Sequence, residues 1–149
     1  MLLETKSKKI NLILRTRKIV DISNKLKAKN FEEVYFKAMN ENDLDALSKI
    51  IYILAENIEG NSAFKSSEEV YDFMDEYKTE NNKSYKDIFE EIATYINNEG
   101  FFTKKMNKKE LQEKISNPLS MVDMNSIIQK SAEKAIANMA ESELSGLKN

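Results

Sequence analysis

The chain has 149 residues, of which 41% are hydrophobic and 32% are charged, so it is long enough to bury a core of its own. It contains no Cys, His or Trp. This composition excludes disulfides, zinc sites of the usual Cys/His kind, and catalysis by a Cys or Ser–His pair. With only three Gly and one Pro, the sequence favours helices.

The net charge of −2 is unevenly spread. Residues 1–30 carry nine basic and two acidic side chains, whereas residues 31–100 carry six basic and seventeen acidic ones. Such asymmetry can orient a partner or a neighbouring copy, or it can simply let the basic N-terminus pack beside the acidic middle. We see no secretory signal and no apolar run long enough to span a membrane, so we expect an intracellular protein without membrane contact.

The first predicted element is a short strand in the segment KKINLILRT, where Ile10, Leu12 and Leu14 alternate with other residues. A lone strand is unstable in water, so it needs a second segment, another chain or a following helix. The next segment, TRKIVDISNKLK, predicts a helix because Ile19, Ile22 and Leu26 share one face.

Five later helix starts are marked by a small polar residue with an acid three positions on, which resembles a capping box. The pairs are Asn30 with Glu33, Asn42 with Asp45, Ser66 with Glu69, Ser84 with Asp87, and Asn107 with Glu110. Three helix ends are marked by Gly60, Gly100 and Gly146, because glycine accepts the left-handed conformation that closes a helix.

The helix that begins near Asp43 is apolar on almost all sides, so we expect it at the centre of the domain. Its stripe also includes Ile58, and Tyr52 and Ile53 widen it. Together with two aromatic stripes further on, it supplies the predicted core: Leu44, Leu47, Ile50, Ile51, Leu54, Phe73, Ile88, Phe89 and Ile92. The sequence thus predicts a mainly α fold, a small helical bundle over residues 1–100 with a short N-terminal β element.

Residues 101–149 differ in character from the bundle. A basic linker and a short helix ending at Asn117–Pro118 precede a long predicted helix without aromatic residues. Its small and flexible stripe is the partner-binding surface that we predict: Met121, Met124, Ile128, Ala132, Ala135 and Met139. The alternatives are a C-terminal helical appendage that folds back on the domain and one that stays disordered until bound.

Paired acids are the first candidates for catalysis, namely Glu32–Glu33, Glu68–Glu69, Asp75–Glu76 and Glu90–Glu91. The composition also leaves a Ser–Lys or Tyr-based site open, but nothing in the sequence points to one. Adjacent helical positions do not face each other, so these pairs fit a solvated face or a helix N-terminus better than an active site. No glycine-rich phosphate loop or EF-hand spacing is present. We therefore expect no enzymatic activity, no cofactor and no metal.

Nucleic-acid binding is a further alternative, because the basic N-terminal segment precedes several short helices. The helix that would have to read the DNA, however, begins with acids and continues as an apolar run, so it would repel phosphates. We expect no nucleic-acid partner, and a small DNA-binding regulator remains the least favoured function.

The run from Arg15 to Glu56 resembles the tail assembly chaperones of long-tailed phages and phage-derived tail-like particles. The matching positions are Ile19, Val20, Ile22 and Leu26, then Phe31 and Ala38, then Asn42, Asp43, Leu44, Leu47, Ile50, Ile51 and Leu54. The similarity extends loosely to about residue 100. The N-terminal strand looks shorter than the usual hairpin of the family, and the C-terminal third has no counterpart.

The resemblance implies a non-enzymatic helper in the cytoplasm of the bacterial host. Such proteins bind the tape measure protein and keep it soluble while tail tube subunits polymerise around it, with many copies on one client. The implied partners are the tape measure protein, the tail tube protein and further copies of the chain. A helical adaptor or structural protein of a prophage or mobile element is the alternative.

Overall fold

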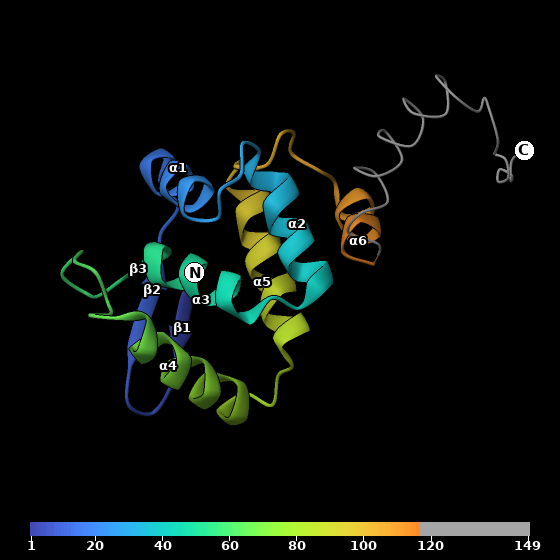
Figure 1. Cartoon of the computed structure of the whole chain (residues 1–149). Coiled ribbons are helices and arrows are strands. Elements are labelled where there is room, and N and C mark those ends of the chain that lie inside the picture. The colour runs from blue at the N-terminus through green and yellow to red at the C-terminus, as the bar shows by residue number, and fades with distance from the viewer. Residues whose placement is uncertain (117–149) are drawn as a thin grey trace, which may run out of the picture.

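Three short strands form an antiparallel sheet against which the helices are arranged (Figure 1). The computed structural model describes residues 1–116. Their elements are β1 (Leu2–Glu4), β2 (Lys9–Leu12), α1 (Thr16–Lys25), α2 (Phe31–Glu41), α3 (Leu44–Leu54), β3 (Ala55–Glu56), α4 (Ser67–Glu80), α5 (Tyr85–Asn98) and α6 (Lys108–Ser116). The fold is therefore mainly helical with a short N-terminal β element, as the sequence predicted.

The predicted N-terminal strand pairs with a second segment, which is one of the possibilities that the sequence left open. β1 pairs with β2 in the register Leu3↔Ile10, and β2 pairs in turn with β3. The hairpin closes where the Thr5 amide donates to the Lys8 carbonyl at 2.8 Å. Leu3, Ile10 and Leu12 point into the core, so one face of the sheet is buried and the other faces solvent.

The predicted end of the central helix was wrong. α3 ends at Leu54, and the following residues are extended and form β3. The Ile13 amide donates to the Leu54 carbonyl at 2.9 Å. Gly60, with a φ of +83°, closes a tight turn further on. Ile58 is fully exposed in this turn, and Leu44 is only partly buried at the first position of α3. We predicted both residues on the apolar stripe of this helix, and the structure places neither of them in the core.

Four of the five predicted helix starts are confirmed by hydrogen bonds to the capping side chains of Asn30, Ser66, Ser84 and Asn107. The fifth was wrong by one residue. The carboxylate of Asp43 caps α3 by accepting from the Ala46 amide at 3.0 Å. Asn42 instead has a φ of +51° and ends α2 in the left-handed conformation that asparagine tolerates.

An aromatic cluster joins α2 to α5 at the centre of the core. The rings of Tyr35 and Phe89 meet edge to face at 6.0 Å, and the Tyr35 hydroxyl donates to the Phe89 carbonyl at 2.6 Å. Burial raises the pKa of this phenol well above its usual value. The other predicted core residues also lie below the surface: Leu47, Ile50, Ile51, Leu54, Phe73, Ile88 and Ile92.

The core continues past residue 100, where we expected the helical domain to end. Phe102 packs on Phe36 with 5.0 Å between ring centroids, and Leu111 and Ile115 of α6 are buried in the same cluster. The side chain of Asn97 holds the connecting loop through two hydrogen bonds to the backbone of Met106. The linker that we predicted from its basic composition thus contributes apolar residues to the fold. Gly146, the third predicted helix end, lies outside the described residues.

Candidate protein-binding surfaces

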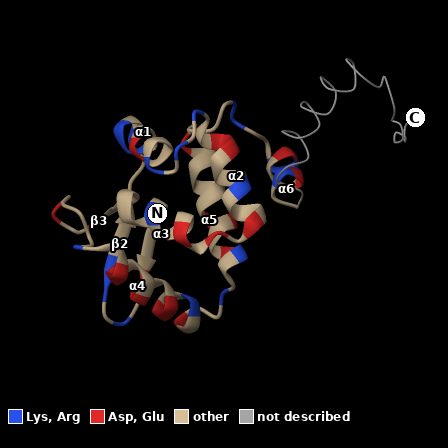
Figure 2. Cartoon of the chain, in the orientation of Figure 1, with Lys and Arg blue, Asp and Glu red and all other residues tan. Residues whose placement is uncertain are grey.

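The outer face of α4 is acidic and carries an exposed aromatic ring. Val70, Phe73 and Met74 point into the core, which leaves Glu68, Tyr71, Asp72 and Asp75 along the solvent side (Figure 2). The side chain of Tyr71 is 42% exposed, and its hydroxyl donates to the Asp45 carboxylate at 3.3 Å. An exposed tyrosine surrounded by carboxylates is an amphipathic side chain of the kind that anchors protein interfaces.

The β1–β2 turn fixes α4 against the sheet. The Ser7 hydroxyl donates to Glu76 at 2.6 Å, and the Lys6 amide donates to Glu80 at 2.9 Å. The hydrogen bond from Ser7 holds the pKa of the Glu76 carboxyl below its usual value. These contacts use Glu76 and Glu80. Of the acids on the outer face, Asp75 accepts from the Tyr85 hydroxyl at 3.1 Å, and Glu68 and Asp72 are exposed and can meet a partner.

α1 has the opposite charge and much less apolar packing. Ile22 is its only buried residue, and Val20 remains 51% exposed. Exposed basic side chains surround the helix and the loop that follows it, namely Arg17, Lys25, Lys27 and Lys29. The described part of the chain therefore presents one basic and one acidic helix surface on the same body.

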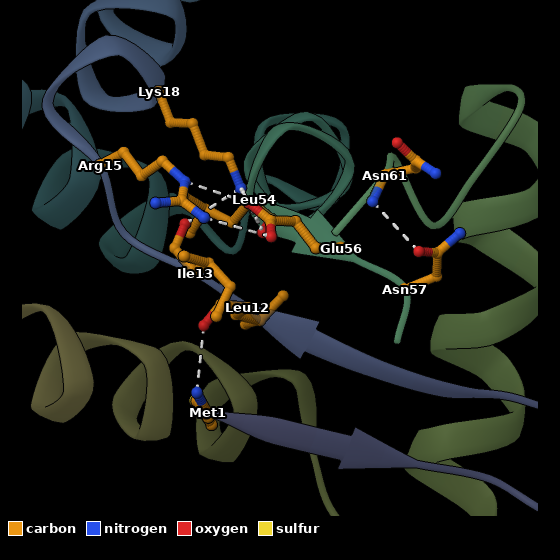
Figure 3. A network of polar contacts seen from close by, with 9 residues as sticks. All are labelled: Met1, Leu12, Ile13, Arg15, Lys18, Leu54, Glu56, Asn57 and Asn61. Carbon is orange, nitrogen blue, oxygen red and sulfur yellow. Dashed lines mark hydrogen bonds and ion pairs between the residues drawn. The ribbon is translucent and has the colours of Figure 1, made fainter. Parts of the chain in front are cut away.

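A polar network acts together with the buried Ile22 and the partly buried Ile19 and Leu26 to set the position of α1 (Figure 3). The Lys18 ammonium donates to Glu56 at 2.6 Å and to the carbonyls of Leu54 and Ile13 at 3.0 and 3.2 Å. Arg15 adds a second ion pair to Glu56 at 3.3 Å. The hydrogen bond from Lys18, supported by Arg15, lowers the pKa of the Glu56 carboxyl. This network ties α1 to the junction between α3 and β3.

Several of the acids that we considered for catalysis make contacts within the fold. Glu32 accepts from the Thr103 amide at 2.8 Å and pairs with Lys114 of α6 at 3.5 Å. Glu91 pairs with Lys83, and Glu69 accepts from the Lys65 amide at 2.9 Å. Residues 1–116 hold no group of three or more acidic side chains placed to bind a metal ion. No helix among them is long and apolar enough to cross a membrane.

An open cleft of about 580 Å³ lies where α2, α4, α5 and α6 meet. Met39, Tyr85 and Ile115 form its apolar wall, and Lys78 and Lys86 lie at its edge. The Ser84 hydroxyl in this cleft is already engaged in capping α5. The partner-binding stripe that we predicted, Met121 to Met139, lies outside the described residues. The candidate binding surfaces described above therefore all belong to residues 1–116.

The α4 surface was missed by sequence reasoning, because its acids were assigned to a solvated face. The spacing of Glu68, Tyr71, Asp72 and Asp75 could have marked it, since an aromatic ring falls on the polar side of an otherwise amphipathic helix. No family model, no curated protein and no solved structure matches the chain. The resemblance to tail assembly chaperones therefore rests on the residues of the Arg15–Glu56 run.

Proposed function

We propose that the chain is a non-enzymatic phage tail assembly chaperone. In this proposal it binds the tape measure protein in the cytoplasm of the bacterial host and keeps it soluble during assembly of the tail tube. The observation that carries the proposal is the outer face of α4, where exposed Tyr71 lies among Glu68, Asp72 and Asp75 on a helix that the hairpin holds in place. Such a face suits a helical client with apolar and basic residues.

Tyr71 supplies the apolar area of this contact, and the carboxylates select the charge of the client. A tape measure protein is long and helix-rich, so it offers many helix faces to successive copies of a small chaperone. The C-terminal stripe from Met121 to Met139 is the second client contact in this proposal, since methionine side chains adapt to irregular surfaces. The tail tube protein and neighbouring copies of the chain are the further proposed partners.

Co-expression with the tape measure protein tests the proposal directly. We expect the client to stay soluble and to copurify with the wild-type chain. The double variant Tyr71→Ala with Asp72→Lys removes the aromatic anchor and reverses one charge, so it should lose most of the copurified client. Both positions are exposed, and the circular dichroism spectrum should not change.

Two matched variants separate the contacts. Glu113→Lys changes an exposed acid on α6 and should leave client binding intact. Ala132→Glu with Ala135→Glu tests the C-terminal stripe in the same assay. If the wild-type chain neither solubilises nor copurifies with the client, the chaperone proposal fails. If the wild-type chain binds the client and the Tyr71→Ala, Asp72→Lys variant binds it equally well, the client contact does not lie on α4.

Two other functions are tested by copurification and by a DNA-binding assay. A helical adaptor or structural protein of a prophage or mobile element would copurify with a different protein of that element. A DNA-binding regulator is the weaker alternative, and the exposed basic side chains of α1 favour it. Retardation of DNA in a gel at low salt, lost on substitution of Arg17 and Lys25, would support that function over the chaperone.

A further inference from the structure

The turn after β3 carries a fully exposed isoleucine on an ordered tip. Ile58 is 100% exposed, which sets it apart from Leu2, Val20 and Tyr71, whose exposure lies between 42% and 53%. The side-chain oxygen of Asn57 accepts from the amides of Glu59 and Asn61 at 2.9 and 3.1 Å. Figure 3 shows the contact with Asn61. The tip is thus held in shape by its own hydrogen bonds.

Backbone contacts complete this turn. The Asn57 amide donates to the Asn61 carbonyl at 2.8 Å, and the Gly60 amide donates to the Asn57 carbonyl at 3.0 Å. A bridge between Glu56 and Ser62 joins the two arms below. A loop that is already ordered loses little conformational entropy on binding, which makes Ile58 a suitable anchor for a contact.

A hollow of about 390 Å³ on another part of the surface has matching properties. It lies between the end of α1 and the first turns of α2, and the partly buried side chains of Leu26, Ala28 and Val34 line it. An isoleucine side chain can pack against these apolar lining residues. The hollow is fixed in shape because the Ala28 amide donates to the Ser23 carbonyl at 2.8 Å, which closes the end of α1.

The rim of the hollow is basic. Lys27, Lys29 and Lys37 surround it, and Glu33 is the one acid among its lining residues. The first turn of α2 also contributes the positive end of its helix dipole. An apolar side chain followed by an acid therefore complements this hollow in both shape and charge, and Ile58–Glu59 at the tip has that order.

We propose that Ile58 of one copy inserts into the α1–α2 hollow of a second copy, with Glu59 beside the rim lysines. Within one molecule the two surfaces lie apart, because the tip projects beyond β3 and the residues that line the hollow belong to the α1–α2 link and the start of α2. Figure 1 shows these two segments on different parts of the molecule. Because the two surfaces differ, each copy offers a free tip and a free hollow, and association runs head to tail. This inference rests on the proposed association between copies but not on the identity of the client.

Sedimentation velocity on the purified chain tests the contact. The interface is small, so we expect weak association that becomes visible at about hundreds of micromolar. Replacing Ile58 by Asp should weaken the association by about ten- to a hundred-fold, because the apolar contact is lost and a charged group enters the hollow. The unfolding midpoint should stay the same, since the side chain makes no contact in the free chain. A wild-type chain that remains monomeric at about 1 mM overturns the proposal.

Cross-linking identifies the two surfaces, and the absence of native cysteine makes it clean. A mixture of the Ile58→Cys and Ala28→Cys variants should form a covalent dimer under mild oxidation. The matched control mixes Ile58→Cys with Thr79→Cys, an exposed position on α4, and should stay monomeric. Equal cross-linking in both mixtures overturns the assignment of the hollow.

A charge exchange completes the test. Glu59→Lys should weaken association, and Lys29→Glu on the second copy should restore it when the two variants are mixed. Glu113→Lys makes the same charge change on α6 and should have no effect. Because these measurements use the chain alone, their failure leaves the client-binding proposal standing, and a failure of client binding leaves the contact between copies standing.

Discussion

α5 and α1 occupy their places in the fold by different means. α5 buries Ile88, Phe89, Ile92, Ala93, Ile96 and Asn97, whereas α1 buries Ile22 alone. Lys18 adds polar contacts that α5 does not need. Its ammonium binds the Glu56 carboxylate, the Leu54 carbonyl at the end of α3 and the Ile13 carbonyl before α1. Apolar packing, with the hydrogen bond from Tyr35 to the Phe89 carbonyl, fixes α5, while the hydrogen bonds and ion pairs of Lys18 and Arg15 orient α1.

The difference matters for function because the exposed faces sit on the less buried elements. A helix with one buried residue leaves most of its surface for partners, and α1 contributes one wall of the hollow that we assign to a second copy. α5 has little surface to offer and acts as the support. The comparison predicts that substitutions in α5 alter stability, whereas substitutions on α1 outside its polar network alter binding.

The largest expected effect is at the centre of α5. Phe89→Ala removes a fully buried ring that meets Tyr35, so we expect a loss of about 3–5 kcal/mol in the free energy of unfolding. The hydrogen bond from Tyr35 to the Phe89 carbonyl can persist, since it uses the backbone. Val20→Ala is the matched change on α1, and it should alter stability by less than about 0.5 kcal/mol. Urea unfolding followed by circular dichroism measures both; equal losses would remove the distinction.

A smaller effect is expected from the polar network. Lys18→Met keeps the apolar stem but leaves the Glu56 carboxylate with Arg15 alone and deprives the Leu54 and Ile13 carbonyls of a donor. We expect a loss of about 1–3 kcal/mol, because a largely buried carboxylate then lacks its closest partner. Lys25→Met removes an exposed lysine from the same helix and should be close to neutral. The same urea titrations measure both variants.

The pH dependence of stability tests whether Lys18 acts through its ion pair with Glu56. The folded-state pKa of Glu56 lies below its ordinary value of 4.5, so its contribution to stability is present above about that pH and is lost as the pH falls through the folded-state pKa. Lys18→Met removes the main cause of this depression. The stability difference between wild type and variant should therefore be constant near neutral pH and shrink in the acidic range below 4.5. A difference independent of pH would show that Lys18 acts through packing.

Local signals in the sequence identified most helices and the face that each one buries. Ser66 and Ser84 accept hydrogen bonds where the capping pattern placed them, and Ile88 and Ile92 are buried as their spacing predicts. These features depend on residues three or four positions apart, which is why a single sequence reveals them. The same holds for the strand at Ile10 and Leu12.

Features that depend on distant segments were missed. α3 gives way to β3 because β2, more than forty residues earlier, offers a ladder to Ala55 and Glu56. Nothing local to NIEG shows that the chain leaves the helix before Ile58. β1 was missed because its three residues are too few for an alternating pattern to be recognised. The exposed tip thus follows from tertiary pairing.

The smallest expected effect concerns the ends of the two compared helices. α1 and α5 end with the same pair of hydrogen bonds, from Lys27 to Asn24 and Ala28 to Ser23 in one, and from Gly100 to Asn97 and Phe101 to Ile96 in the other. The residue at the left-handed position is Lys27, with a φ of +55°, in α1 and Gly100, with a φ of +78°, in α5. Glycine alone adopts this conformation without a steric penalty from Cβ.

Lys27→Gly should therefore stabilise the fold by about 0.5–1 kcal/mol, and Gly100→Ala should destabilise it by a similar amount. A Cβ at residue 100 would meet no atom within 4 Å, so the expected loss at that position comes from the backbone alone. Asn82→Gly tests the intermediate case after α4, where asparagine already tolerates a φ of +51°, and should gain less than Lys27→Gly. Thermal unfolding of the three variants orders them. If Lys27→Gly gains no more than Asn82→Gly, the left-handed lysine is not a cost in this fold, and the end of α1 is as well satisfied as that of α5.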